Sequence, residues 1–189
     1  RTVYREEESA GKCRKLAGKI EDGIKRYGIT ELPPFGKIYA YETDGLGNYV
    51  FMDDANCPSL LSLPYLEYCT ADDEVYKNTR AYILSEEKPC YFSGSVIKGV
   101  GSPHTKKGNV WPIGIIMQAL TSGDAEEIKE CMDMLLASHA GTDYMHESIN
   151  ADDPEDYTRS WFAWANSLFA ELLIRVKELG IYDAGGKGQ

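Results

Sequence analysis

The stretch VWPIGIIMQALTSGDAEEIKECMDMLLAS, residues 110–138, decides the fold class. Apolar residues recur every three or four positions from 111 to 120, which is the spacing of one face of an α-helix. Gly123 ends this helix, and Asp124 followed three residues later by Glu127 is typical of the start of another. The segment therefore predicts two helices joined by a short turn, and such pairs indicate an all-α protein.

Similar signals predict four more helices. Residues 5–27 carry an apolar stripe on a charged background, and Gly28 follows its end. Pro58 opens a short apolar segment, and residues 70–73 resemble a capping box before a helix that reaches Ile83. Asp153 and Pro154 are expected to begin the last helix, over residues 153–179, which is apolar nearly all round and must be covered on most sides.

Two stretches of the chain do not follow the helical pattern. Residues 37–53 carry β-branched and aromatic side chains on both sides of Asp44-Gly45, which predicts a β-hairpin and the only sheet expected. Residues 88–109 read as a long glycine-rich loop, and loops of that length tend to be functional. Three helix pairs and one hairpin fit a closed or partly closed helical toroid better than an open solenoid, because no 34-residue repeat is present.

Composition narrows the function. The chain has 189 residues, is 43% hydrophobic and carries a formal charge of -10 with no long block of either sign, so we expect neither nucleic acid nor a membrane as a partner. Its five cysteines are scattered and its three histidines lack ligand spacing, so no metal is expected and no cofactor is implied. Serine-elbow and phosphate-loop motifs are absent, which leaves carboxylate chemistry.

Polar residues gather at four loop-to-helix boundaries, in residues 52–56, 101–105, 144–148 and 152–159. Boundaries at one rim of a helical toroid converge on a single pocket, so these clusters are the candidate site. Each has a plainer interpretation. The acidic pair in 52–56 would cap the following helix, the histidines would be satisfied polar residues, and the tryptophans would belong to the core.

Six strings, taken in order, closely resemble glycoside hydrolase family 125: MDDANCPSLLSLPYL (52–66), VYKNTRAYILS (75–85), GVGSPHT (99–105), VWPIGIIMQALTS (110–122), MHES (145–148) and DDPEDYTRSWFAWANSLFAEL (152–172). The resemblance implies an (α/α)6 barrel and a metal-independent, exo-acting α-1,6-mannosidase that inverts the anomeric configuration. It thereby implies an α-mannoside or a mannose-containing glycan as the substrate.

The resemblance also implies roles for particular residues. Glu147, in the M-H-E motif, matches the general base that activates water in an inverting glycosidase. Trp111 is expected either to face the sugar ring or to pack in the core, and Arg159 either to orient an acidic residue or to form a local ion pair. The residues expected to bind the sugar are Asp53, Asp54, Asn56, His104, His146, Trp111 and Arg159.

Six helices are about half of the twelve in such a barrel. Residues 1–189 are therefore expected to form a single partial catalytic domain, the carboxyl-terminal part of the barrel, with the general-acid aspartate upstream. The missing amino-terminal half is then an expected partner. The isolated chain is expected to be inactive because the general acid is absent, and to associate or be poorly stable because apolar helix faces would be uncovered. The alternative is a non-catalytic mannose-binding or scaffold fragment.

Overall fold

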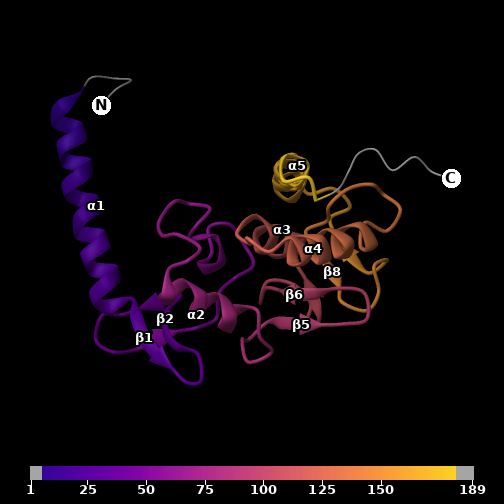
Figure 1. Ribbon diagram of the computed structural model, residues 1–189. Helices are drawn as coiled ribbons and strands as arrows, with labels where there is room; N and C mark the ends of the chain where they lie inside the picture. Colours follow the sequence, from indigo (N-terminus) through magenta and orange to yellow (C-terminus); the bar gives the residue numbers. More distant parts are fainter. Residues whose placement is uncertain (1–5, 182–189) are drawn as a thin grey trace.

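A computed structural model describes residues 6–181 and shows a mixed α/β fold (Figure 1). The all-α prediction is wrong, because short strands pair in several of the connections between helices. The α-helices are α1 (Glu7–Tyr27), α2 (Glu74–Ile83), α3 (Pro112–Leu120), α4 (Ala125–Ala137) and α5 (Ala163–Glu178), and η1 (Leu60–Ser62) is a 3-10 turn. Within these residues, the predicted three helix pairs reduce to α4 and α5 packing on α3, while α2 packs on strand β2 (Gly36–Tyr39).

The strands form four small antiparallel sheets within residues 6–181. The predicted hairpin around Asp44-Gly45 exists, but its strands are only two residues long. The expectation of a single sheet is wrong, because three other connections also pair. The four sheets are β1 (Ile29–Leu32) with β2; β3 (Glu42–Thr43) with β4 (Tyr49–Val50); β5 (Tyr91–Ser93) with β6 (Lys98–Val100); and β7 (Asn109–Val110) with β8 (Ser148–Asn150) and β9 (Tyr157–Thr158).

The segment predicted as a long loop, residues 88–109, holds β5 and β6 and leads into β7. Its glycines allow the close backbone contacts of this region. A Cβ atom on Gly94 would lie 2.3 Å from the carbonyl oxygen of Ala151, and one on Gly101 would lie 2.3 Å from that of Asn109. The loop is therefore a packed part of the domain, because only glycine leaves room for these neighbouring backbones.

Helix α5 begins at Ala163, nine residues after the predicted start at Pro154. The Asp153-Pro154 signal belongs to a turn, in which the Asp153 side chain accepts a hydrogen bond from the backbone N–H of Glu155. The following residues pair with β8 as strand β9 before the helix starts at Ala163. A local side-chain-to-backbone bond of this kind serves a turn as well as a helix start, so the sequence signal was ambiguous.

The core is centred on α3, a helix that the apolar spacing of residues 111–120 predicted correctly. Eight of its nine residues are buried, and the helix is covered by α4, α5 and β6. Pro112 occupies its first turn, where a missing backbone N–H costs nothing. The start of α3 is therefore buried among the neighbouring segments.

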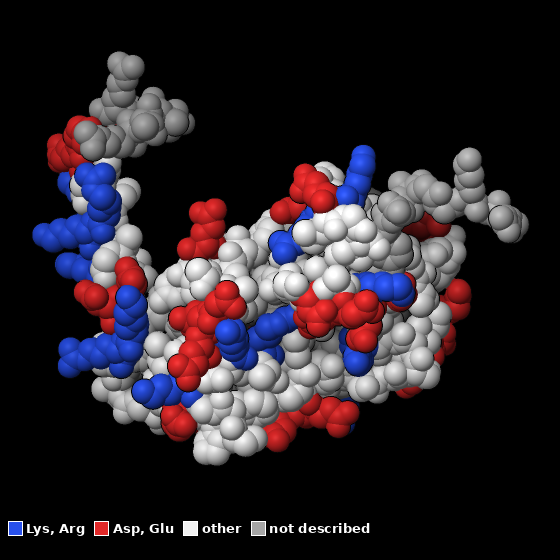
Figure 2. Space-filling model, viewed as in Figure 1, with Lys and Arg blue, Asp and Glu red and all other residues white. Residues whose placement is uncertain are grey.

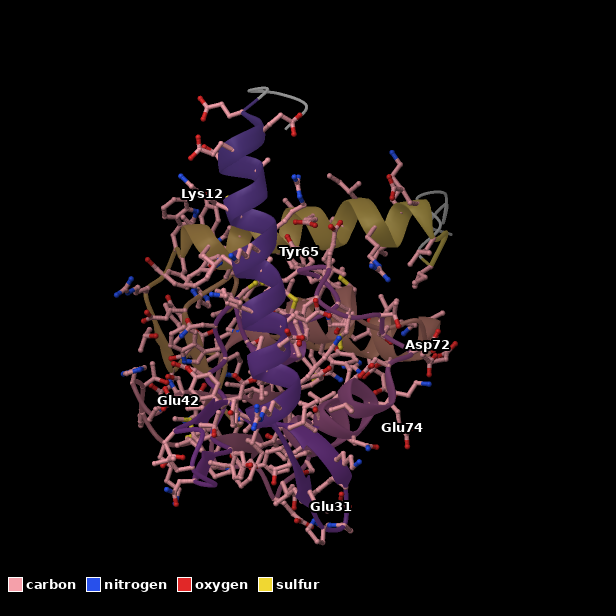
Figure 3. All side chains as sticks on the ribbon, turned by 90° about the vertical axis from the view of Figure 1, so that its left-hand side faces the viewer. Lys12, Glu31, Glu42, Tyr65, Asp72 and Glu74 are labelled. Carbon is pink, nitrogen blue, oxygen red and sulfur yellow. The ribbon has the colours of Figure 1, made fainter. Side chains whose placement is uncertain are left out.

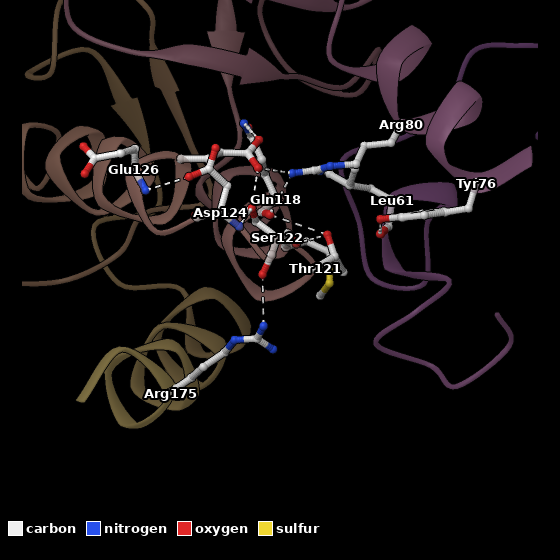
Figure 4. Close-up of polar contacts among 11 residues, drawn as sticks. Leu61, Tyr76, Arg80, Gln118, Thr121, Ser122, Asp124, Glu126 and Arg175 are labelled. Atoms are coloured by element: carbon white, nitrogen blue, oxygen red, sulfur yellow. Dashed lines mark hydrogen bonds and ion pairs between the residues drawn. The ribbon is translucent and has the colours of Figure 1, made fainter. Parts of the chain in front are cut away.

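A partly buried polar network joins four helices at the far end of α3 (Figure 4). Glu127 of α4 accepts hydrogen bonds from Arg80 of α2, at 2.6 Å, from Gln118 of α3, at 2.8 Å, and from Ser122. Arg175 of α5 donates to the backbone carbonyl of Ser122. Burial alone would raise the pKa of Glu127, but these donors outweigh it and hold the pKa below its usual range.

Helix α1 stands apart from the body of the domain, to which it is joined at β1 (Figure 1). None of its residues is buried, although its length agrees with the prediction. Figure 2 shows the hollow between this helix and the rest of the molecule, and Figure 3 places Lys12 on the end of α1 that lies away from Glu31 of β1. Among the described residues, no helix is both long and apolar enough to cross a bilayer.

Candidate active site

Glu147 lies immediately before β8, and its backbone N–H donates to the carbonyl oxygen of Thr158, at 3.2 Å. Its side chain is 15% exposed and both carboxylate oxygens have partners. Oε1 lies 3.3 Å from Nε of Arg159, and Oε2 accepts a hydrogen bond from the Thr158 hydroxyl at 3.1 Å. The carboxylate is thus held in one orientation, has a counter-charge beside it and keeps part of its surface open to solvent.

Arg159 belongs to the same cluster but is itself largely exposed. Its backbone has a φ of 49°, in the left-handed region that few non-glycine residues adopt. The guanidinium lies 5.5 Å from the centre of the Phe162 ring, which is a cation–π contact. Arg159 forms an ion pair with Glu147, a contact that fits both roles left open by the sequence, so the choice between them stays a prediction.

Trp111 connects this cluster to the 101–105 loop. It lies directly before α3, is 5% exposed and meets the Phe162 ring edge to face, with ring centres 6.3 Å apart. Its indole N–H donates to the hydroxyl of Thr105 at 3.0 Å. The indole therefore packs in the core in this structure, and its use as a platform for a sugar ring stays a prediction.

Asp54, Asn56 and His104 form a second polar group, as the sequence anticipated. One oxygen of the Asp54 carboxylate accepts a hydrogen bond from the Asn56 amide at 2.9 Å and lies 3.6 Å from Nε2 of the exposed His104. The other accepts from the backbone N–H of Ala55. An acceptor, an amide and an imidazole gathered in this way offer the mixture of donors and acceptors that sugar hydroxyls require.

Asp53 points into the protein rather than toward solvent, with 1% of its surface exposed. One carboxylate oxygen accepts from the backbone N–H of Leu60, at the start of η1, and the other has no hydrogen-bond partner. Burial raises the pKa of this carboxyl to about 7, against the opposing charge of Lys88. The plainer interpretation of Asp53, as a group that satisfies the backbone of the next turn, describes its observed contacts.

Lys88 is a buried residue that the sequence analysis missed. Its ammonium donates to the carbonyl oxygens of Asp53, at 2.6 Å, and Pro89, at 2.9 Å. Burial lowers its pKa, and the nearby carboxyl of Asp53 opposes that shift. A single lysine in a glycine-rich stretch carries no pattern that would have predicted this burial.

His146 is completely buried beneath the site. Its ring stacks on Tyr157 with 3.8 Å between ring centres, and its two ring nitrogens lie 3.3 Å from the carbonyl oxygens of Arg159 and His139. The structure therefore separates His146 from the exposed polar group. The ring thus contacts backbone carbonyls of two segments, one before and one after Glu147 in the sequence, and direct sugar binding by it stays a prediction.

The sequence analysis also missed Thr158 and Ser148, although both lie in the strings that carry the family resemblance. Ser148 is the cross-strand partner of Thr158 in the sheet, and their hydroxyls are 2.8 Å apart. Finding this pair required the pairing of β8 with β9, but the residues of β9 were predicted to lie in the last helix and those of β8 in a loop. Within residues 6–181, no group of three His, Cys, Asp or Glu side chains is arranged to hold a metal ion.

Comparison with known proteins gives the same family as the motifs. Residues 2–174 match the family described as metal-independent alpha-mannosidase (GH125). The chain belongs to this family. The GH125 chain is 55% identical over 163 residues to the Meiotically up-regulated gene 157 protein of Schizosaccharomyces pombe, which covers 86% of this chain and 32% of that protein.

A solved GH125 structure also resembles the chain. It is a Streptococcus pneumoniae metal-independent alpha mannosidase in a non-productive substrate complex with alpha-1,6-mannobiose. The match has a TM-score of 0.90 and 44% identity, and it covers 94% of this chain and 42% of the streptococcal one. The chain thus spans about a third of the yeast protein and about two fifths of the streptococcal protein.

Proposed function

We propose that residues 1–189 are a partial catalytic domain of an inverting exo-α-1,6-mannosidase, in which Glu147 is the general base. Membership of GH125 supports the α-mannosidase activity, and the mannobiose complex of the streptococcal relative supports a mannose-containing substrate. The observation that carries the proposal is the environment of the Glu147 carboxylate.

A general base must be correctly oriented and must reach a water molecule. Arg159 and Thr158 orient the Glu147 carboxylate, while 15% of the side chain remains exposed. Asp53 lies in the interior, and the Asp54 carboxylate contacts Asn56 and His104, with which it forms the second polar group. Glu147 is therefore the best placed of these three carboxylates to take a proton from water.

Asp54, Asn56 and His104 are proposed to bind the hydroxyl groups of the mannose ring. Their donors and acceptors lie together in one group, and the Trp111 side chain contacts Thr105, next to His104, and also Phe162, on which Arg159 packs. A sugar bound beside this group would present its anomeric carbon toward a water molecule held by Glu147. The sugar would be fixed by several weak contacts, as polyhydroxylated ligands require.

An inverting enzyme also needs a general acid, roughly 6.5 to 9.5 Å from the base. We propose that the general acid comes from a region that corresponds to the part of the relatives' length outside the match with this chain. The same part would cover the groove of about 540 Å³ between α1 and the β3–β4 hairpin, which is lined by Ile20, Ile24 and Tyr27 of α1. Leu16 and Ile20 of α1 are 59% and 53% exposed, and such an apolar stripe is costly to leave in water.

The test is Glu147→Gln in the full-length protein, assayed for release of mannose from α-1,6-mannobiose. The amide keeps the shape of the side chain but cannot accept the proton of water, so kcat is expected to fall about 10²- to 10⁴-fold. Azide, which attacks without losing a proton, is expected to restore turnover as mannosyl azide. Glu155→Gln, an exposed neighbour in the same segment, is the matched control and should leave kcat unchanged.

Three outcomes would separate the alternatives. Undiminished turnover by Glu147→Gln removes this residue from the mechanism. Binding of mannobiose without cleavage by the unmodified full-length protein would favour the non-catalytic mannose-binding alternative. Faster cleavage of another α-glycoside would keep the hydrolase but change the sugar, and nuclear magnetic resonance of the first-formed sugar anomer tests inversion.

A further inference from the structure

A chain of hydrogen bonds runs across the three-stranded sheet β7–β8–β9 and ends on Glu147. The side-chain amide of Asn109, on β7, donates to the hydroxyl of Ser148, on β8, at 3.0 Å. That hydroxyl lies 2.8 Å from the hydroxyl of Thr158, on β9, which in turn donates to Oε2 of Glu147 at 3.1 Å. Each strand thus contributes one polar side chain to a single path.

The direction of every proton in this path follows from its end. A carboxylate has no proton, so the hydroxyl proton of Thr158 must point to Glu147. The Thr158 oxygen then accepts from Ser148, and the Ser148 oxygen accepts from the amide of Asn109, which is a donor through its nitrogen. All three donors therefore point toward Glu147. This arrangement suits an ionised carboxylate at that position, which is the form that a general base requires.

The path is not explained by sheet formation. Backbone bonds already pair Ser148 with Thr158 and join β7 to β8, so the sheet does not need these side-chain bonds. Ser148 and Asn109 are fully or almost fully buried, where a polar side chain costs free energy unless it is paired. Valine in place of Thr158 would suit a strand at least as well.

We propose that Thr158 is a positioning residue for the general base, and that Ser148 and Asn109 fix the direction in which its hydroxyl points. The inference rests on the proposed function, because it assigns Thr158 a part in the reaction only through Glu147. A carboxylate held by a directed hydroxyl on one oxygen and by Arg159 on the other keeps its free lone pairs aimed at the attacking water. Without that hydroxyl it can rotate away from the productive orientation.

The variant that tests the proposal is Thr158→Val in the full-length protein, which keeps the shape and removes the hydroxyl. Hydrogen bonds to charged groups contribute enough that kcat for α-1,6-mannobiose is expected to fall about 10- to 100-fold, with KM almost unchanged. Thr158→Ser, which retains the hydroxyl, should recover most of kcat. The exposed Thr70→Val is the matched control and should leave both constants unchanged.

A double-mutant cycle separates positioning from structure. In the Glu147→Gln background with azide as the nucleophile, no base is needed, so adding Thr158→Val is expected to change the rate of mannosyl azide formation less than about twofold. An equal loss in both backgrounds, or failure of Thr158→Ser to recover kcat, would overturn the positioning role. Loss of kcat in Glu147→Gln with none in Thr158→Val refutes only this inference, whereas full activity in Glu147→Gln refutes the proposed function.

Discussion

Helices α3 and α1 show opposite relations between sequence pattern and burial. Helix α3 has nine residues, eight of them buried, and contributes the centre of the core. Helix α1 has twenty-one residues and none is buried, although its apolar stripe is regular. Amphipathic periodicity therefore predicted that a helix forms, but it did not predict whether a neighbour covers its apolar face.

The contrast matters because the candidate site lies on the well-packed side. Arg159, the partner of Glu147, packs on Phe162, and Phe162 packs on Trp111, the residue directly before α3. The candidate site is therefore supported by the core. Helix α1 contributes instead to an open apolar groove. A region packed around its own core can hold side chains in fixed positions. The apolar face of α1 can be covered only by a further segment of protein.

The largest expected effect comes from Ile116→Ala in α3, whose side chain is fully buried. Removing this packing leaves a cavity, so the free energy of unfolding should fall by about 2–5 kcal/mol. Chemical denaturation measures the change. Leu16→Ala in α1 is the comparison within the 189-residue chain and should cost less than about 0.5 kcal/mol. Equal losses would show that α1 is buried in solution.

The second prediction compares a covered carboxyl with an open one across pH. Burial raises the pKa of Asp53 from 3.8 to about 7, so the folded state binds its proton more tightly than the unfolded state. Its contribution therefore lowers stability as pH rises from about 4 to about 7. Asp53→Asn should remove that decline and gain up to about 4 kcal/mol over the unmodified protein across this interval.

Asp156 is the control of opposite sign, measured in the same pH titration of unfolding. Hydrogen bonds from Lys106 and Asn150 lower its pKa, so its stabilising contribution is present above about pH 4 and is lost as the pH falls. Asp156→Asn should therefore weaken the protein at neutral pH and leave it unchanged in acid. A pH profile for Asp53→Asn that parallels the unmodified protein would contradict the burial of Asp53.

The smallest expected effect sharpens the account of α1. Ile20→Ala should cost less than about 0.5 kcal/mol in the 189-residue chain, because the side chain is about half exposed. In the full-length protein the same change should cost about 1–2 kcal/mol, since covering the stripe buries this side chain. Thermal unfolding of both proteins, each with and without the substitution, measures the difference. The same small cost in both would mean that nothing covers the groove.

Helix punctuation in the sequence was read correctly where a cap and an apolar stripe agreed. Asp124 accepts a hydrogen bond from the first turn of α4, as its position predicted. The capping box expected over residues 70–73 is replaced by a single cap, because Asp73 itself precedes α2 and accepts from the backbone N–H of Tyr76. The same type of signal failed at Asp153, because its side chain caps a turn and the next residues pair in β9. A short strand of two or three residues has too little pattern to be recognised without its partner.

The candidate site was predicted in part. The grouping of Asp54, Asn56 and His104 was expected, and Arg159 does contact an acidic residue, Glu147. The role of Glu147 as the general base stays a prediction. The complete burial of His146 and the hydrogen bond that the Thr158 hydroxyl donates to Glu147 were not expected. These features depend on strands whose partners are distant along the chain.

The sequence by itself determined the family, the core helices and the residue types available for carboxylate chemistry. These properties are carried by local spacing and by short ordered motifs, which need no knowledge of distant neighbours. Only the tertiary structure decided which carboxylates face solvent, which apolar stripes are covered, and which hydroxyl supports Glu147. Burial and side-chain hydrogen bonding join segments that are distant in the sequence. Their contribution to stability therefore arises only when folding brings those segments into contact.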